Sequence, residues 1–467
     1  MRNSILTISI LLAVSVLGAA KAIAQTGSPG YVVTDLGDLG GGEAVASSIN
    51  SSGQIVGFSH LAEHTLNNAC DERRAFLFED GGMVELASLP GTRFATASAI
   101  SDAGDVSGTN DVYVADASCS GGCFPGSCAV QTPVLVRDGF TLDLSAPLPW
   151  YAGVANDVNN LGQVVGWSRK ADLPNSRTWH AYLWENGVRT DLGTLDRDWS
   201  IATGINDEGL VVGYSQLVEG SNLWYGFRWS NGGMTALPFL GENTYNGAND
   251  VNATGEAVGW SGPSVTEVSP VFYPASGGAL DLGGLGGTEG SAFALNNRGS
   301  VVGYSYTAGN QSRHAFVYRD GRLWDLNQLV AADSDWELIA ATDINDVGQI
   351  VGFGCKGSRV VPPASCMDAN GTNTFRRAFL LTPVVSVVDL EDIVISLDLP
   401  QGLQTSLLAK LAAARRAIDA GRTRTACNLL AALASEVEAQ SGKGLTTAQA
   451  ELLLQTLRLI QTDLGCA

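Results

Sequence analysis

The 467-residue sequence predicts a mainly β fold: a seven-bladed antiparallel β-propeller closed by an N-terminal strand, followed by a small C-terminal α-helical bundle. Three observations support this prediction. One sequence unit recurs seven times, the last copy lacks a final strand that is present before the first copy, and apolar residues take a helical period after Pro383. We therefore expect a signal peptide in residues 1–24, the propeller in 25–384 and a helical domain in 385–467.

The repeated unit consists of motifs typical of short strands and tight turns. Its first motif, apolar-Asn-x-x-Gly-x-apolar-apolar-Gly-aromatic-Ser, predicts a hairpin, because Asn bonds its own backbone at a turn and Gly accepts a positive φ. The copies occupy residues 49–57, 100–108, 158–166, 205–213, 251–259, 295–303 and 344–352. An R/H-A-F-apolar-aromatic strand and an apolar-Asp-Leu-Gly strand follow. The second copy departs furthest, with Ser101 for Asn, Ser107 within the apolar pair and Thr132-Pro133-Val134 for HAF.

The position of the fourth strands predicts closure of the ring. These strands occupy residues 34–37, 84–87, 142–145, 190–193, 235–238, 280–283 and 324–327. The first lies before the first Asn-x-x-Gly turn, and none follows residues 377–381. We therefore expect residues 31–37 to complete the last sheet, which removes an exposed strand edge. An open β-repeat is the alternative.

The repeats resemble the HAF repeat of bacterial extracellular proteins, most plainly at His314-Ala315-Phe316. The resemblance covers about residues 31–383. It implies secretion and a repeat scaffold, and it implies no shared catalytic residues.

The C-terminal segment has the apolar spacing of helices. Leu403, Leu407, Leu411 and Ile418 form one apolar face, a second helix is expected over about 423–439, and a third from Thr446 or Thr447. Residues of about 386–467 resemble the FIMAH domain of secreted bacterial proteins, on the matching stretches 406–411, 437–443 and 445–450. This resemblance implies a location outside the cytoplasm and no particular chemistry.

The N-terminus has the three parts of a secretory signal. Arg2 supplies the positive charge, residues 5–20 the apolar stretch and Ala22-Ile23-Ala24 the cleavage site. An uncleaved anchor is the alternative, although the apolar stretch is shorter than the roughly 20 residues that span a membrane. We expect a secreted or periplasmic protein without membrane insertion after cleavage.

Eight cysteines fit an oxidising compartment. We expect Cys355 to pair with Cys366 across a short insertion and Cys427 with Cys466 in the helical segment. The remaining disulfide cysteines are Cys70, Cys119, Cys123 and Cys128, whose pairing stays open. A zinc site at Cys119, Cys123 and Cys128 is the weaker alternative, because structural zinc sites usually have paired short spacings.

The histidines are few. His180 and His314 occupy one repeat position, which predicts polar groups at strand ends rather than ligands. His60 and His64 with Glu63 have a spacing that attracts metals, but no third ligand is evident. The sequence therefore predicts no metal-binding residues.

Two further residue sets recur with the repeat. Acids recur on the fourth strands at Asp35, Glu85, Asp143, Asp191, Asp281 and Asp325, and aromatic residues follow the repeat glycine at Phe58, Trp167, Tyr214, Trp260, Tyr304 and Phe353. Ala236 and Thr109 are the exceptions. We expect the acids to accept hydrogen bonds in turns, with an axial calcium site as the alternative. We expect the aromatic residues to pack between blades, with a ring that stacks on sugars or peptides as the alternative.

These features predict an exported, non-catalytic propeller that binds a protein or glycan through its loop-lined face, as a monomer and without a cofactor. The sequence holds no G-x-S-x-G, H-E-x-x-H, Walker or EF-hand motif. Its formal net charge of −20 disfavours nucleic acid and anionic membranes as partners. The alternative is a polysaccharide hydrolase or lyase with paired acids at the propeller mouth.

Overall fold

The computed structural model describes residues 30–61, 72–115, 127–145, 152–169, 178–196, 199–216, 223–361, 365–367 and 373–466. The signal peptide predicted for residues 1–24 lies outside these ranges. The strands are β1 (Tyr31–Asp35), β2 (Gly40–Ile49), β3 (Ile55–Leu61), β4 (Arg73–Glu79), β5 (Gly82–Glu85), β6 (Thr92–Ile100), β7 (Val106–Ala115), β8 (Ser127–Arg137), β9 (Phe140–Asp143), β10 (Gly153–Val158), β11 (Val164–Arg169), β12 (Trp179–Glu185), β13 (Val188–Gly193), β14 (Ser200–Ile205), β15 (Val211–Gln216), β16 (Trp224–Ser230), β17 (Gly233–Ala236), β18 (Tyr245–Val251), β19 (Ala257–Ser264), β20 (Glu267–Tyr273), β21 (Leu280–Asp281), β22 (Gly286–Leu295), β23 (Val301–Thr307), β24 (Arg313–Arg319), β25 (Arg322–Asp325), β26 (Trp336–Ile344), β27 (Ile350–Lys356), β28 (Arg359–Val361), β29 (Ser365–Met367), β30 (Asn373–Thr374) and β31 (Arg377–Pro383). The helices are α1 (Val387–Ser396), α2 (Gln401–Asp419), α3 (Thr423–Gln440) and α4 (Thr447–Asp463).

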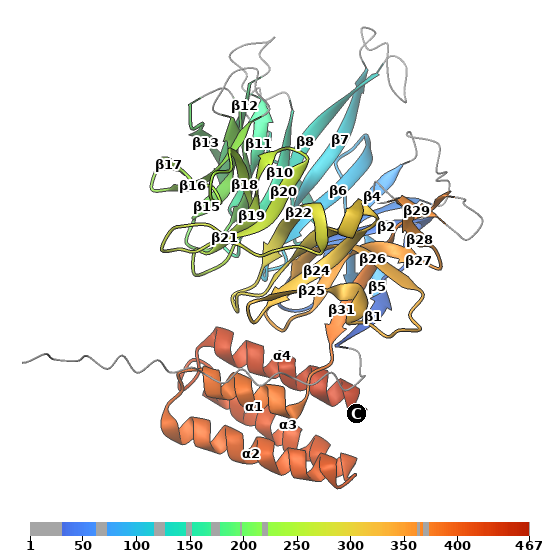
Figure 1. The fold of residues 1–467 in the computed structure, drawn as a ribbon, viewed down its shortest axis with the longest axis vertical. Coiled ribbons are helices and arrows are strands. Elements are labelled where there is room, and N and C mark those ends of the chain that lie inside the picture. Colours follow the sequence, from blue (N-terminus) through green and yellow to red (C-terminus); the bar gives the residue numbers. More distant parts are fainter. Residues whose placement is uncertain are drawn as a thin grey trace, which may run out of the picture.

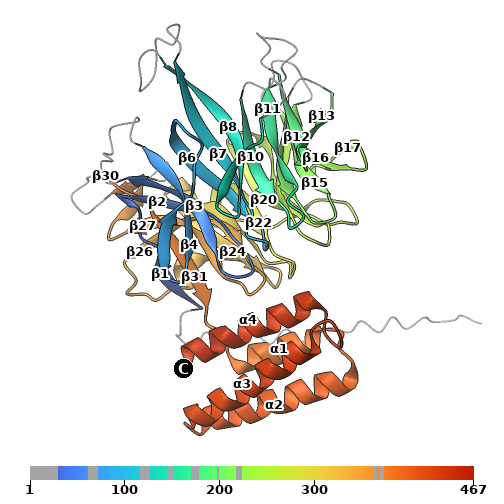
Figure 2. The same cartoon turned by 180° about the vertical axis from the view of Figure 1, so that it is seen from behind.

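Within the described residues, most strands pair into four-stranded antiparallel groups, which we call units 1 to 7. Units 1 to 6 consist of β2–β5, β6–β9, β10–β13, β14–β17, β18–β21 and β22–β25, and unit 7 consists of β26, β27, β31 and β1. A single parallel residue pair links unit 1 to unit 2, and another links unit 5 to unit 6. The units lie side by side in a propeller-like arrangement (Figures 1 and 2).

The predicted pairing of the first strand with the last is present in unit 7. Antiparallel pairing of β1 with β31 runs from Tyr31 opposite Pro383 to Asp35 opposite Phe379. The Tyr31 side chain is only 2% exposed. A difference from the prediction lies between β27 and β31, where β28, β29 and β30 form a small sheet in place of a plain loop insertion.

Each unit begins with the predicted hairpin. In unit 1, the amide of Gly53 donates to the carbonyl of Asn50, and Asn50 Oδ1 accepts from the amide of Gln54. Gly53 has a φ of +81°, which L-residues with a side chain rarely adopt. The second strands are buried on both faces as predicted, since Val164 and Val165 are both fully buried in unit 3.

The repeated asparagines also link one unit to the next. Their side-chain Nδ2 atoms donate to the carbonyl of the equivalent residue in the following unit, from Asn50 to Ser101, Asn159 to Asn206, Asn206 to Asn252, Asn252 to Asn296, Asn296 to Asn345 and Asn345 to Asn50. The last of these bonds joins unit 7 to unit 1 at 3.2 Å. Ser101 has no side-chain amide, so the series is interrupted between unit 2 and unit 3.

The C-terminal segment contains one helix more than the three that we predicted. The additional helix, α1, begins with a capping box between Ser386 and Asp389 and buries Leu390 and Val394. The capping-box residues were visible in the sequence. We did not predict this helix because the segment is short and directly follows the last strand. All four helices contribute to one apolar core, and they lie below the sheets in Figure 1. No described helix is both long and apolar enough to cross a membrane.

Two of the predicted disulfides are present. Cys355 is bonded to Cys366 and Cys427 to Cys466, with Cα atoms 5.4 and 5.5 Å apart. The first staples the insertion between β27 and β31, and the second ties the chain end to α3. Cys70, Cys119 and Cys123 lie outside the described residues, as does the side chain of Cys128.

Candidate functional site

The recurrent acids of the fourth strands accept hydrogen bonds within their own turns. Oδ1 of Asp35 accepts from the amide of Gly37, and the same bond recurs at Asp143, Asp191, Asp281 and Asp325. Glu85 instead pairs with Arg74. Among the described residues, no group of three or more His, Cys, Asp or Glu side chains is placed to hold a metal ion. The five aspartates therefore have the turn-forming role that we expected, and Glu85 does not.

The first polar residue of the HAF motif pairs with the same acids across the sheet. His180 lies 2.8 Å from Asp191, His314 lies 2.8 Å from Asp325, and arginines take this position as Arg74 with Glu85 and Arg377 with Asp35. His60 lies on β3, whereas Glu63 and His64 lie outside the described residues. The HAF histidines are thus strand-end partners of an acid, as predicted.

His314 differs from His180 because it contacts a second acid. Its Nε2 lies 3.5 Å from Glu337 in unit 7. Burial alone lowers the pKa of His314, but its hydrogen bonds to Asp325 and Glu337 outweigh burial and raise the pKa to about 9. The protonated side chain therefore links units 6 and 7.

This contact predicts a pH-dependent stability. Because the folded-state pKa of His314 exceeds the ordinary value of about 6.5, its contribution is complete below that pH and is lost as the pH rises through about 9. We expect His314→Gln to lower the free energy of unfolding by about 2 kcal/mol at pH 6 and far less at pH 9.5. Urea denaturation at both pH values measures this difference. The matched control is His180→Gln, and an equal loss at both pH values would contradict the prediction.

Three aspartates of the first strands escaped the sequence prediction. Asp157, Asp250 and Asp343 lie on the first strands of units 3, 5 and 7, and each accepts from a backbone amide of the following unit. Burial, with a contribution from the neighbouring aspartates, raises the pKa of Asp157 to about 8 and that of Asp250 to about 7. The recurring sequence Asp-apolar-Asn marked them, but the amides they bind are distant in sequence.

The buried serines of the Gly-aromatic-Ser motif also have structural partners. Ser215 Oγ accepts from the amide of Leu195 and donates to the carbonyl of Trp199. The equivalent amide bonds are made to Ser59, Ser261 and Ser305. The recurrence of one arrangement in several units argues against a role as a single nucleophile.

In four of the units, the recurrent aromatic residue is covered by the first residue of the third strand. Arginine lies over the ring in unit 1, where Arg73 is 5.2 Å from the centroid of Phe58, and in unit 6, where Arg313 is 3.6 Å from that of Tyr304. In units 3 and 4 this covering residue is instead Trp179 or Trp224. These covering contacts lie within single units, so they do not test the packing between blades that we expected.

Because tryptophan replaces arginine, units 3 to 5 contain a continuous series of aromatic rings, which we call the aromatic chain. Its members in order of contact are Trp167, Trp179, Trp199, Trp224, Tyr214, Trp260 and Tyr245. The rings of Trp179 and Trp199 stack with centroids 5.0 Å apart and join units 3 and 4, and Tyr214 lies 6.1 Å from Trp260 in unit 5. All seven residues are partly exposed.

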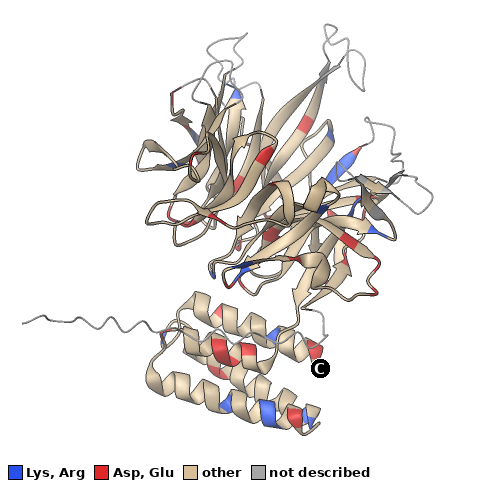
Figure 3. Ribbon diagram, viewed as in Figure 1, with Lys and Arg blue, Asp and Glu red and all other residues tan. Residues whose placement is uncertain are grey.

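Three of the seven members of the aromatic chain were predicted from the sequence. The repeat position predicted Trp167, Tyr214 and Trp260, whereas Trp179, Trp199, Trp224 and Tyr245 lie outside the recurrent position and were missed. In the ribbon view of Figure 3, Asp and Glu positions are scattered over the sheets, and the blue segments of Lys and Arg are few. The aromatic chain is the longest series of contacting aromatic rings among the described residues.

Comparisons with known proteins give limited similarity. The profile of a family described as "protein of unknown function (DUF3466)" matches residues 149–373. No curated protein matches the sequence. An acylaminoacyl peptidase from Pyrococcus horikoshii matches with 11% identity and a TM-score of 0.40 over 71% of this chain and 52% of the peptidase, so the chain spans about half of that protein's length.

Two further solved structures are similar at the same level. TolB from Acinetobacter baumannii matches with 14% identity and a TM-score of 0.38, over 62% of this chain and 63% of TolB. The β-propeller domain of the Trilobed protease from Pyrococcus furiosus matches with 12% identity and a TM-score of 0.33, over 61% of this chain and 98% of that domain. The resemblances to HAF repeats and to the FIMAH domain stay predictions.

Proposed function

We propose that the chain is an exported, non-catalytic β-propeller whose aromatic chain binds a glycan. The observation that carries this proposal is a series of seven partly exposed rings in contact across three neighbouring units. The C–H groups on the face of a sugar ring carry partial positive charge and are attracted to the negative face of an aromatic ring. A row of such rings suits an extended polysaccharide better than a single small molecule.

The finer architecture is part of the same proposal. We take units 1 to 7 to be the seven blades of one closed propeller built from HAF-type repeats and followed by a FIMAH-like helical domain. The pairing of β1 with β31 and the Asn345 to Asn50 hydrogen bond support closure, because both join the two ends of the repeat region. A closed ring leaves only short, protected sheet edges and gives the aromatic chain a rigid base.

The proposed location is the periplasm or the medium. The sequence pattern of residues 1–24 supports export, and the disulfides Cys355–Cys366 and Cys427–Cys466 suit an oxidising compartment.

A binding role is favoured over hydrolysis by the state of the acids. A glycosidase needs two free carboxyl groups roughly 5 to 10 Å apart. The recurrent acids instead accept backbone amides in their own turns or pair with histidine and arginine. The recurrent acids are therefore engaged in turns and ion pairs of their own units, which favours a structural role for them.

The test is binding of the full chain to a panel of immobilised bacterial and plant polysaccharides. We expect at least one polysaccharide to bind, with affinity reduced at least tenfold by Trp199→Leu and by Trp224→Leu, and without release of reducing ends. Trp336→Leu is the matched control, because Trp336 packs on Phe379 in unit 7, away from the aromatic chain. Thermal unfolding checks that each variant is folded.

Two results would count against this proposal. If no polysaccharide binds and the chain captures a protein instead, then the glycan assignment is wrong. Release of reducing ends in proportion to the amount of the purified chain would mean that the chain is an enzyme.

A further inference from the structure

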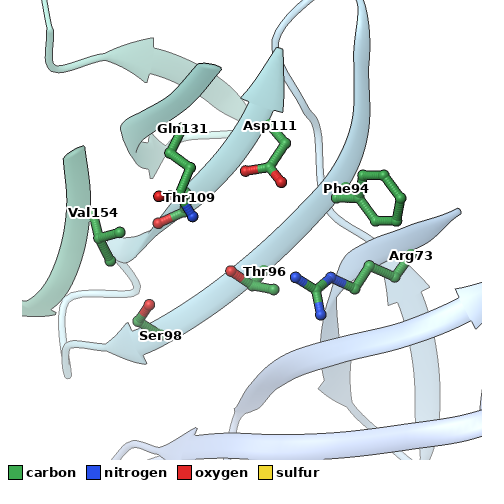
Figure 4. A pocket seen from close by; sticks show the side chains of 8 residues that line it. All are labelled: Arg73, Phe94, Thr96, Ser98, Thr109, Asp111, Gln131 and Val154. Atoms are coloured by element: carbon green, nitrogen blue, oxygen red, sulfur yellow. The ribbon is translucent and has the colours of Figure 1, made fainter. Parts of the chain in front are cut away.

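Unit 2 contains a polar cavity of about 130 Å³ near its boundary with unit 1. Its lining includes Arg73 on β4, Phe94 and Thr96 on β6, Thr109 and Asp111 on β7, and Gln131 on β8. Figure 4 shows these side chains around one space, with the Arg73 guanidinium and the Asp111 carboxylate extending from different strands. The cavity therefore combines a cation, an anion, neutral hydrogen-bonding groups and one aromatic ring.

The cavity exists because unit 2 departs from the repeat at two matched positions. In units 1, 3, 4 and 6 the residue after the repeat glycine is aromatic, and the first residue of the third strand covers it, as with Trp167 and Trp179 in unit 3. In unit 2 the ring is replaced by Thr109 and the covering residue by Gln131. Two small polar side chains thus stand where other units have two large ones, and the space is left open.

Two side-chain atoms of the lining residues are buried without a hydrogen-bond partner. Thr109 is 7% exposed, and its Oγ1 is buried without a hydrogen-bond partner. Arg73 has its Nε buried without a partner, and its guanidinium lies between the rings of Phe58 and Phe94, at 5.2 and 5.7 Å from their centroids. A buried polar atom without a partner costs free energy that a ligand can recover.

The charges of the cavity are also poorly compensated. Arg73 and Asp111 attract each other but form no direct ion pair. Burial lowers the pKa of Arg73 and raises the pKa of Asp111, so each charged form is held in an environment that disfavours it. A ligand that carries one negative and one positive group would stabilise both charges together.

The size of the cavity limits the ligand. A cavity of roughly 150 Å³ in another protein holds benzene, so this space suits about six non-hydrogen atoms, the number in alanine, and is too small for a monosaccharide. We propose that the cavity binds a small free amino acid, with its carboxylate on the Arg73 guanidinium, its ammonium on the Asp111 carboxylate and its side chain toward Phe94. This site uses other residues than the aromatic chain and does not depend on the proposed glycan binding.

Calorimetric titration of the full chain tests the proposal, with glycine, L-alanine, D-alanine and L-serine as probes. We expect saturable binding of at least one of them with a dissociation constant below about 1 mM. Alaninamide, which lacks the carboxylate, and N-acetylalanine, which lacks the ammonium, should each bind at least tenfold more weakly. Equal binding of either analogue would show that the pair of charges is not what the cavity recognises.

Variants locate the site. Thr109→Phe restores the aromatic residue of the repeat and fills the cavity, so we expect it to abolish binding and to leave the melting temperature unchanged or raised. Arg73→Gln and Asp111→Asn should each weaken binding at least tenfold, whereas Arg93→Gln, in which a nearby arginine paired with Glu72 is replaced, should not. Absence of binding by the unaltered chain, or undiminished binding by a folded Thr109→Phe variant, would overturn the proposal.

Discussion

A chain that begins at Gly40 is expected to unfold at least about 5 kcal/mol more easily than a chain that begins at Gly30. The deletion removes β1, which is the fourth strand of unit 7. Tyr31 and Leu36 are almost completely buried, so the change removes two large apolar side chains from the core as well as a five-residue ladder with β31. It also leaves β31 as a free strand edge, and such edges promote association between chains.

Guanidinium unfolding and size-exclusion chromatography measure both effects. The chain that begins at Gly30 is the control, because it retains β1 and lacks only the residues before it. The shortened chain should have a lower unfolding midpoint and should elute partly as oligomers. An unchanged midpoint would mean that the repeats stack as an open array in which the first strand contributes little.

Gly303→Ala is expected to lower the free energy of unfolding by about 4 kcal/mol or more, or to prevent folding. Gly303 pairs with Ala292 on the neighbouring strand, and a Cβ atom at this position would overlap the carbonyl oxygen of Ser291. The obstacle is backbone rather than a movable side chain, and Phe316 lies opposite Gly303 on the third strand. The same Ala–Gly pair recurs in the other units at Gly57, Gly108, Gly166, Gly213, Gly259 and Gly352.

Urea unfolding of Gly303→Ala checks this expectation, with Gly82→Ala as the control. Gly82 is the first residue of β5, and a Cβ atom there would come no closer than 3.9 Å to the carbonyl oxygen of Glu79. We expect the control to change stability by less than about 1 kcal/mol. Similar, small losses in both variants would show that close approach of the strands is not what selects glycine in the repeat.

The two proposed sites were predictable from the sequence to different extents. Thr109 was recognisable as an exception to the repeat, but its meaning depends on Gln131, which is opposite Asp111 only because β7 pairs with β8. In the aromatic chain, Trp179 and Trp199 meet across the boundary of two units, and neither belongs to a motif. In both sites, a residue that departs from the repeat acts together with a residue on another strand.

The sequence alone determined the local structure of each repeat, because the interactions that shape it are short in range: Asn50 binds the amide of a residue four positions away, and the glycine beside it accepts a backbone angle that other residues avoid. The tertiary structure decided which repeats meet and what lies between them. The side-chain amide of Asn345 donates to the carbonyl of Asn50, which is 295 residues away in the sequence. Arg73 of unit 1 lines a cavity that exists because unit 2 has small residues at two positions. Contacts of that kind depend on how whole sheets pack against each other. A local pattern of residues does not predict that packing.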